Sequence, residues 1–146
     1  RRVRAVRVER AVSAVHTRPA PTLTDLRRSA IRFRVAGVSF QPGYPGNLLA
    51  LQAPAEAALA AGEGLPVVLQ RDPHNAYDRN AVQVHIPSVG MVGHLPARLA
   101  ERAAPKMDAG QRFAGEVVGV AVDPLHPDRP GLEVRVWRQQ DDGAQL

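Results

Sequence analysis

The amino-acid sequence predicts a mainly β protein (α+β), a small OB-like or modified β-barrel of about six strands with one or two short helices. Short stretches in which every second residue is hydrophobic recur between residues 31 and 137. Turns rich in Pro and Gly separate these stretches, and only two segments have a clearly helical composition. Strands this close together favour a partly open barrel over a parallel sheet, whose strands need long crossovers between them.

The expected strands follow one another at short intervals. The first begins at residue 31, where Ile31, Phe33 and Val35 alternate with arginines and predict a half-buried strand. Gly37 and the Pro- and Gly-rich segment 41–46 then indicate turns. The further strands are expected over residues 67–69, 81–86, 90–95, 113–122 and 132–137, the last two joined by a loop rich in Pro and Asp.

Two segments between the strands predict helices. One covers residues 54–61, because Pro54 suits a first helical turn and Gly62 a helix end. The other covers residues 96–104 and also begins at a proline. Both are short, as the barrel architecture requires.

The positive charge of the chain is concentrated at its start. The net charge is +5, but residues 1–34 hold ten arginines against Glu9 and Asp25, a net charge of +8, and the remainder carries −3. The pattern over residues 1–15 is compatible with a short helix, and residues 17–24 resemble a linker. The expected organisation is a basic, flexible arm over 1–30, a barrel domain over 31–139 and a tail over 140–146.

Such a basic arm suits the phosphate backbone of a nucleic acid, which it would bind without reading the base sequence. Arg-rich, acid-poor segments are also typical of solvated leaders and targeting segments, and this alternative stays open. Because the sequence begins at Arg1, it can also be a fragment of a longer protein.

Composition excludes several classes of protein. The chain has no cysteine, so it has neither disulfides nor thiolate metal sites. No apolar run is long enough for a membrane span or a secretory signal, and a cytoplasmic location, with nucleoid association, is the expectation. No Walker loop, Gly-x-Ser-x-Gly or His-Glu-x-x-His motif occurs. We therefore predict no enzymatic activity and no cofactor.

The histidines do not indicate a metal site. Three of them, His74, His85 and His94, lie in the central region, but their spacing matches no zinc motif. His85 alternates with apolar neighbours and is expected to face solvent. No metal is predicted.

Residues 72–80 form a polar loop between two expected strands. Asp72 before Pro73 favours a turn, and the side chains of Asn75, Asp78 and Asn80 can each bind neighbouring backbone amides in Asx-turns. The order of these residues does not fit an EF-hand calcium loop. Two interpretations remain equally open: a loop that stabilises itself while Tyr77 plugs the end of the barrel, or a binding rim. In the second, Tyr77 stacks on a ligand and Asp78 accepts a hydrogen bond from a hydroxyl or amine.

The few aromatic residues divide into two groups. Phe113 and Trp137 lie in expected strands and are assigned to the core. Phe40 stands where a strand meets a loop, so its ring could be exposed. Exposed rings on small barrels are the usual platform for unpaired bases.

Three segments together resemble the HIRAN domain family: Val35–Phe40, Leu69–Val84 and Val92–Pro96. The resemblance covers about residues 32 to 122 or beyond, which is most of the expected folded part, and leaves the basic arm unexplained. HIRAN domains occur fused to SWI/SNF-type fork-remodelling ATPases and as stand-alone bacterial proteins. The resemblance implies a modified OB-like barrel and, as in the eukaryotic members, capture of single-stranded DNA at a free 3′-hydroxyl end, in DNA repair or replication-fork processing. The implied partners are this DNA end and a helicase or ATPase, as a separate chain or a fusion.

The resemblance also implies roles for individual residues. Tyr77 would be the ring that stacks on the terminal base, and Asp78 the acceptor of the 3′-hydroxyl. Phe40 stands at the first aromatic position of the family pattern, and His94 stands in the Gly-His-Leu element beside the pocket. The resemblance gives no role to Arg71, Arg79 and Arg98, but these cations, together with the basic arm, are available for contacts with phosphate.

The chain departs from the pattern of the eukaryotic DNA binders at three positions. Ser39 stands in place of an arginine, Gln41 in place of a second aromatic residue, and Ala97 in place of a lysine. These departures predict weaker DNA binding. They also keep open an alternative from another class, a protein-interaction or regulatory module that has lost DNA binding on the same scaffold. The sequence predicts no particular oligomeric state.

Overall fold

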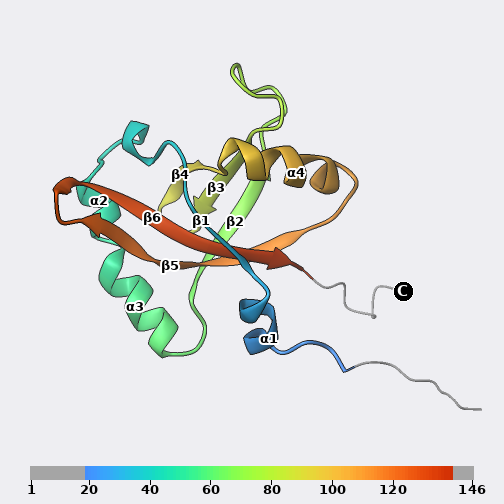
Figure 1. The fold of residues 1–146 in the computed structure, drawn as a ribbon, viewed down its shortest axis with the longest axis horizontal. Coiled ribbons are helices and arrows are strands. Elements are labelled where there is room, and N and C mark those ends of the chain that lie inside the picture. Colours follow the sequence, from blue (N-terminus) through green and yellow to red (C-terminus); the bar gives the residue numbers. More distant parts are fainter. Residues whose placement is uncertain (1–18, 140–146) are drawn as a thin grey trace, which may run out of the picture.

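A computed structural model of the protein describes residues 19–139, and Figure 1 shows its fold. One curled antiparallel sheet has the strand order β1-β6-β5-β2-β3-β4. The strands are β1 Ile31–Arg34, β2 Leu65–Arg71, β3 Val82–Ile86, β4 Gly90–His94, β5 Phe113–Asp123 and β6 His126–Arg138. The predicted fold class, a small mainly β barrel of about six strands, is confirmed. The expectation of a short helix within residues 1–15 lies outside the described residues, as does the expected tail.

The two edges of the sheet meet and close the barrel on one side. Ala36, which follows β1, pairs with His94 at the end of β4 in an isolated antiparallel bridge. Both backbone hydrogen bonds form, with the amide of Ala36 2.8 Å from the carbonyl oxygen of His94 and the reverse pair at 2.9 Å. Edge strands expose unpaired backbone groups to other chains, and this bridge removes part of that exposure.

The core fills the inside of the curled sheet. Val82, Val84 and Ile86 of β3 are fully buried, and they alternate with Gln83 and His85, which are half-buried on the other face. The predicted alternation of this strand is confirmed. His85 is not simply solvated, because its Nε2 lies 2.8 Å from Oε1 of Gln83.

In the view of Figure 1, helices lie above the sheet and below it. The described chain contains α1 Leu23–Arg28, the 3-10 turn η1 Val38–Phe40, α2 Gly46–Leu49, α3 Gln52–Ala60 and α4 Ala97–Asp108. The two predicted helices correspond to α3 and α4, and α4 continues four residues beyond its expected end. It passes through Pro105, and Met107 beyond the proline still packs against the core. In the part that the structure describes, no helix has the length and apolar character of a membrane span.

The sequence pattern did not predict α1, which lies within residues expected to form a linker and a flexible arm. A capping box begins this helix: the Thr22 hydroxyl accepts from the amide of Asp25, and the Asp25 carboxylate accepts from the amide of Thr22. These hydrogen bonds hold the pKa of Asp25 below its usual value. The Thr-x-x-Asp spacing is a helix-start signal that the prolines before it obscured.

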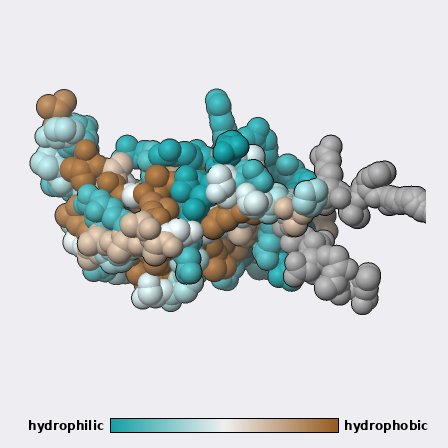
Figure 2. Space-filling model, turned by 90° about the horizontal axis from the view of Figure 1, so that it is seen from below, coloured by the Kyte–Doolittle hydropathy of each residue, from teal (hydrophilic) through white to brown (hydrophobic). Residues whose placement is uncertain are grey.

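β5 and β6 form a long hairpin where the sequence predicted a Pro- and Asp-rich loop. The strands turn between Asp123 and His126, and β6 includes Pro127 and Pro130. Prolines are tolerated there because β1 pairs only with residues 133–136, which leaves the start of β6 without a second neighbour. Figure 2 shows hydrophobic surface at this hairpin end of the molecule, and Leu125 in the turn is 83% exposed.

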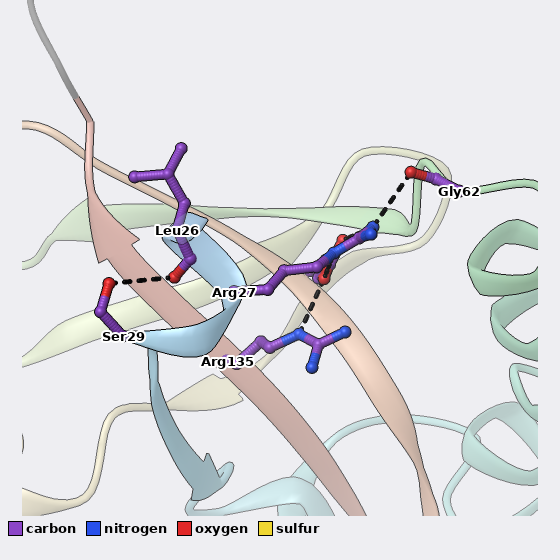
Figure 3. A network of polar contacts seen from close by, with 6 residues as sticks. Leu26, Arg27, Ser29, Gly62 and Arg135 are labelled. Atoms are coloured by element: carbon purple, nitrogen blue, oxygen red, sulfur yellow. Dashed lines mark hydrogen bonds and ion pairs between the residues drawn. The ribbon is translucent and has the colours of Figure 1, made fainter. Parts of the chain in front are cut away.

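A buried ion cluster attaches α1 to the outside of the sheet (Figure 3). Glu116 of β5 is 2% exposed; Arg27 of α1 donates to its two carboxylate oxygens at 2.6 and 2.8 Å, and Arg135 of β6 donates at 2.7 Å. Arg27 also donates to the carbonyl oxygen of Gly62, at the turn after α3. Burial by itself would raise the pKa of Glu116, but the hydrogen bonds from the two guanidinium groups outweigh it and hold the pKa below its usual value.

The lowered pKa of Glu116 predicts a loss of stability in acid. A carboxyl group whose pKa is lower in the folded state stabilises the fold fully above its unfolded pKa, and this contribution is lost as the pH falls through the folded value. We therefore expect the melting temperature to decrease once the pH is lowered below about 4.5. In the Glu116→Gln variant this decrease should be less steep. Thermal melts between neutral pH and about pH 3 test this; parallel profiles for the two proteins would contradict it.

Candidate nucleic-acid interface

The loop between β2 and β3 is held in shape by Asn75. Its side-chain oxygen accepts from the amides of Tyr77 and Asp78, at 2.9 and 3.1 Å, and its amide nitrogen donates to Asp72 at 3.0 Å. The Asp72 carboxylate also accepts from Gln83 at 3.3 Å. The hydrogen bond from Asn75 is the main reason why the pKa of Asp72 lies below its usual value. The loop is therefore an ordered structure whose own side chains fix its backbone.

Asp78 helps to fix the backbone of this loop with one carboxylate oxygen and keeps the other available for a ligand. Its Oδ1 accepts from the amide of Asn80 at 2.8 Å. Within the described chain, no hydrogen bond involves Oδ2. Of the three expected Asx-turn residues, Asn75 and Asp78 accept backbone amides through their side chains, and Asn80 contributes its backbone amide. Asp78 can thus cap the loop and still accept a hydrogen bond from a ligand.

The ring of Tyr77 projects into solvent. The side chain is 97% exposed, so the interpretation that Tyr77 plugs the end of the barrel is wrong. The loop in which it stands extends beyond α4, away from the body of the sheet (Figure 1). Leaving an aromatic ring in water forgoes the stabilisation that burial would give it. An ordered loop that presents such a ring is typical of a contact surface.

Arg71, at the end of β2, is engaged in holding this loop. Its guanidinium donates to both carboxylate oxygens of Asp108 on α4, at 2.9 and 3.3 Å, and to the carbonyl oxygens of Ala81 and Arg79. The side chain is only 16% exposed. Arg71 therefore lies at the base of the loop as a positioning residue, and its expected contact with phosphate stays a prediction. Asp108 was not predicted as part of this region.

Phe40 presents a second exposed ring. It ends the 3-10 turn η1, and its side chain is 88% exposed. Gly37 begins this turn with a positive φ of 74°, which a residue with a Cβ rarely adopts. The Gln41 side chain, at the position of the missing second aromatic residue, donates to the carbonyl oxygen of Gly37 at 3.3 Å.

The end of β4 brings the two ring-bearing segments together. His94 pairs with Ala36, four residues before Phe40, while the amide of the next residue, Leu95, donates to Val82 at 2.9 Å, just after the Tyr77 loop. Two consecutive residues thus tie both segments to one point of the barrel. The imidazole of His94 is half-buried and lies near enough to Asp72 to contribute to its lowered pKa. His94 thus contributes to the geometry through its main chain.

The described residues contain no cluster of three or more His, Cys, Asp or Glu that could hold a metal ion. The groups that the surface offers are exposed aromatic rings, an available carboxylate oxygen and nearby backbone groups. Such a surface can stack on planar groups and accept a hydrogen bond.

Comparison with known proteins identifies the family. The sequence model of the HIRAN domain matches residues 29–139, and the chain therefore belongs to the HIRAN domain family. The chain is 27% identical in sequence to a protein from Lactobacillus plantarum whose crystal structure is known. The two structures superpose with a TM-score of 0.50 over 75% of this chain and 92% of that protein. The HLTF HIRAN domain in its DNA-bound conformation, solved by NMR, is 25% identical over 75% of this chain and 73% of its own, with a TM-score of 0.44.

Among curated proteins, the Homo sapiens helicase-like transcription factor is 50% identical over 42 residues. This match covers 29% of the present chain and 4% of the human protein. The present chain therefore corresponds to a small part of that relative.

Proposed function

We propose that this chain is a non-catalytic DNA-binding module that captures single-stranded DNA at a free 3′-hydroxyl end. Membership of a family in which one solved domain has a DNA-bound conformation supports binding to DNA. The observation that carries the proposal for capture of a 3′-hydroxyl end is the loop between β2 and β3, whose backbone is held by Asn75. This loop presents the exposed ring of Tyr77 directly before Asp78 and its available carboxylate oxygen. Phe40 offers the second ring, and His94 lies beside the point where the two segments meet.

The chemistry of these groups suits a strand end. An aromatic ring stacks on any base, with about 1–3 kcal/mol per base, and this interaction tolerates any sequence. An ionised carboxylate accepts a strong hydrogen bond from a 3′-hydroxyl, whereas it repels a 3′-phosphate. Stacking by Tyr77 and Phe40 would therefore supply affinity, and Asp78 would supply discrimination between ends.

The setting in the cell that we propose is supported by the family. One relative is a helicase-like transcription factor, which supports action beside a helicase or ATPase, as a fusion or a partner. We place the activity in DNA repair or replication-fork processing, in the cytoplasm at the nucleoid. The barrel over residues 31–139 would be the binding unit, with the basic residues before it adding contacts to phosphate.

A second candidate is a protein-interaction module that has lost DNA binding. The observation that favours it is the state of Arg71, whose guanidinium is bound to Asp108 and to loop carbonyls. Together with Ser39 and Ala97, this leaves few cations near the two rings. Measured DNA affinity at low salt decides between the two candidates.

Replacing Asp78 by asparagine is expected to remove end discrimination and leave the fold intact. The amide oxygen of asparagine can still accept from the amide of Asn80, so the loop keeps its shape. Its NH₂ group now faces the strand end and donates to a phosphate, where the carboxylate repelled it. The wild-type protein should prefer a 3′-hydroxyl over a 3′-phosphate by about tenfold or more, equivalent to at least one charge-assisted hydrogen bond. The variant should bind the two ends within about twofold of each other.

Fluorescence anisotropy with oligonucleotides that differ only at the 3′ end measures this preference. The matched control is Asp72→Asn, which removes one negative charge from the same loop without changing the presented oxygen. It should keep the preference for the hydroxyl. Equal affinity of the wild-type protein for both ends would overturn end capture, and no binding at low salt would favour the protein-interaction module.

A further inference from the structure

The helix α4 carries its charges on two flanks of opposite sign. Arg98, Arg102 and Lys106 are spaced four residues apart, so they follow one another along one side of the helix. All three side chains are exposed. Glu101 and Asp108 lie on the other flank of the buried face, because each residue advances the helix by about 100°. Arg98 also neighbours Glu101 at the i,i+3 spacing, so the side of α4 that is basic throughout is the one formed by Arg102 and Lys106.

The two flanks meet different surroundings. On the acidic flank, Asp108 is bound by Arg71, which lowers the pKa of the Asp108 carboxyl and neutralises its charge. On the basic flank, within the described chain, none of the three cations forms an ion pair. Three cations are thus available at a spacing of about 6 Å along the helix axis.

An apolar groove runs beside this basic edge. A cavity of about 240 Å³ lies between α4 and the β1–β6 edge of the sheet, with Arg102 and Lys106 at its rim and Leu99 and Phe113 among its floor residues. A second cavity of about 350 Å³ shares Lys106 and Phe113 with the first and adds Arg138 at its far rim. Because the two cavities share Ile31, Lys106, Phe113 and Val136, we treat them together as one groove, which has an aromatic residue in its lining and cations along its sides.

Helix α4 links the groove to the surface formed by Tyr77, Asp78 and Phe40, which we call the strand-end surface because we propose that it binds the end of a DNA strand. α4 begins at Ala97, three residues after His94, and runs from there toward the side of the molecule where β6 ends (Figure 1). A ligand held at the Tyr77 and Phe40 rings could therefore continue along α4. A positively charged groove with an aromatic floor is what non-specific single-strand binders use to follow a backbone.

We infer that the basic flank of α4 and the groove beside it bind the DNA strand on the 5′ side of the captured end, with Arg98, Arg102 and Lys106 on its phosphates. This inference rests on the proposed function. It also accounts for phosphate binding in a domain whose cations near the two rings are few. The regular spacing along one direction favours a polyanion chain over a compact acidic patch of a protein.

The length dependence of binding tests the inference. Oligothymidylates of about 3 and about 12 nucleotides with the same 3′-hydroxyl separate contacts at the end from contacts along the strand. The wild-type protein should bind the longer strand more tightly than the shorter one. In Arg102→Gln/Lys106→Gln, the ratio of these two affinities should be roughly tenfold smaller at low salt. Loss of two phosphate contacts should also flatten the slope of log affinity against log salt by about 1.4 for the longer strand. Binding of the short strand should change by less than about twofold.

The matched control is Arg34→Gln/Arg112→Gln, which removes the same charge at exposed positions that do not line the groove. Unchanged length and salt dependence in the α4 variant, or equal losses in the control, would overturn the inference and leave the groove to a protein partner. A wild-type protein that shows the length dependence but no preference for a 3′-hydroxyl would overturn end capture and retain the strand path. The two proposals therefore fail separately.

Discussion

Replacing Glu116 by alanine is expected to lower the free energy of unfolding by about 3 kcal/mol, because it removes the one acceptor shared by two guanidinium groups. Arg27 and Arg135 both donate to this carboxylate at 2.6–2.8 Å, and their side chains are only 21% and 19% exposed. Without Glu116, two positive charges would face each other beneath α1 with little access to water. Breaking one side of a buried ion cluster typically costs 3–5 kcal/mol, and the partial exposure of the arginines places this case at the lower end.

Urea denaturation measures the change, and an exposed ion pair provides the control. Arg32 and Glu133 lie 3.1 Å apart, but their side chains are 56% and 38% exposed. Glu133→Ala should therefore change the free energy of unfolding by no more than about 1 kcal/mol. Equal effects of Glu116→Ala and Glu133→Ala would show that burial of the cluster does not determine its contribution. Selective loss of protection from hydrogen exchange in α1 would show that the cluster attaches this helix.

The fold class was predictable because hydrophobic periodicity reports directly on which side of a strand is buried. Val82, Val84 and Ile86 show this most clearly, since their alternation needs no knowledge of the partner strands. The helix α1 was missed because prolines obscure its Thr22–Asp25 start signal and because tertiary contacts stabilise it, above all the pairing of Arg27 with a residue 89 positions away. Pro127 and Pro130 concealed the start of β6 for a related reason: whether proline is tolerated depends on which strand edges are paired, and local sequence does not reveal this.

The candidate site was only partly predictable from sequence. The spacing of Asn and Asp residues indicated a self-stabilised loop, and the structure assigns that task mainly to Asn75. The exposure of Tyr77 could not be derived, because a single tyrosine in a polar loop can point inward or outward at no cost visible in the sequence. The binding of Arg71 to Asp108 was invisible for the same reason that long-range contacts usually are, since 37 residues separate them. Sequence thus indicated which groups are present, and the fold decided which remain available.

Replacing Gly93 by alanine is expected to open the barrel, and thereby to lower both the stability of the domain and its affinity for a 3′-hydroxyl end. Gly93 has φ 153°, and an added Cβ would overlap the carbonyl oxygen of Ala36 and lie 2.6 Å from Cγ1 of Val35. The atom that must move belongs to the backbone that pairs with His94, so the two bridging hydrogen bonds would be lost or lengthened. Overpacking and backbone strain each cost about 1–3 kcal/mol, which gives a loss of about 3 kcal/mol in stability. For a domain of this size, that corresponds to a fall of about 10 °C in melting temperature.

Gly90→Ala in the same hairpin separates the contact from the strain. Gly90 also has a positive φ, 104°, but nothing lies within 4 Å of an added Cβ. This control should therefore lose only the cost of strain, about 1 kcal/mol, and should bind DNA as the wild type does. Gly93→Ala should bind a 3′-hydroxyl end several-fold more weakly even at temperatures where it is fully folded, because the Phe40 segment is displaced from the Tyr77 loop. Equal stability and equal affinity in the two variants would mean that the pairing of Ala36 with His94 does not position the two rings, and that each segment presents its aromatic residue independently of barrel closure.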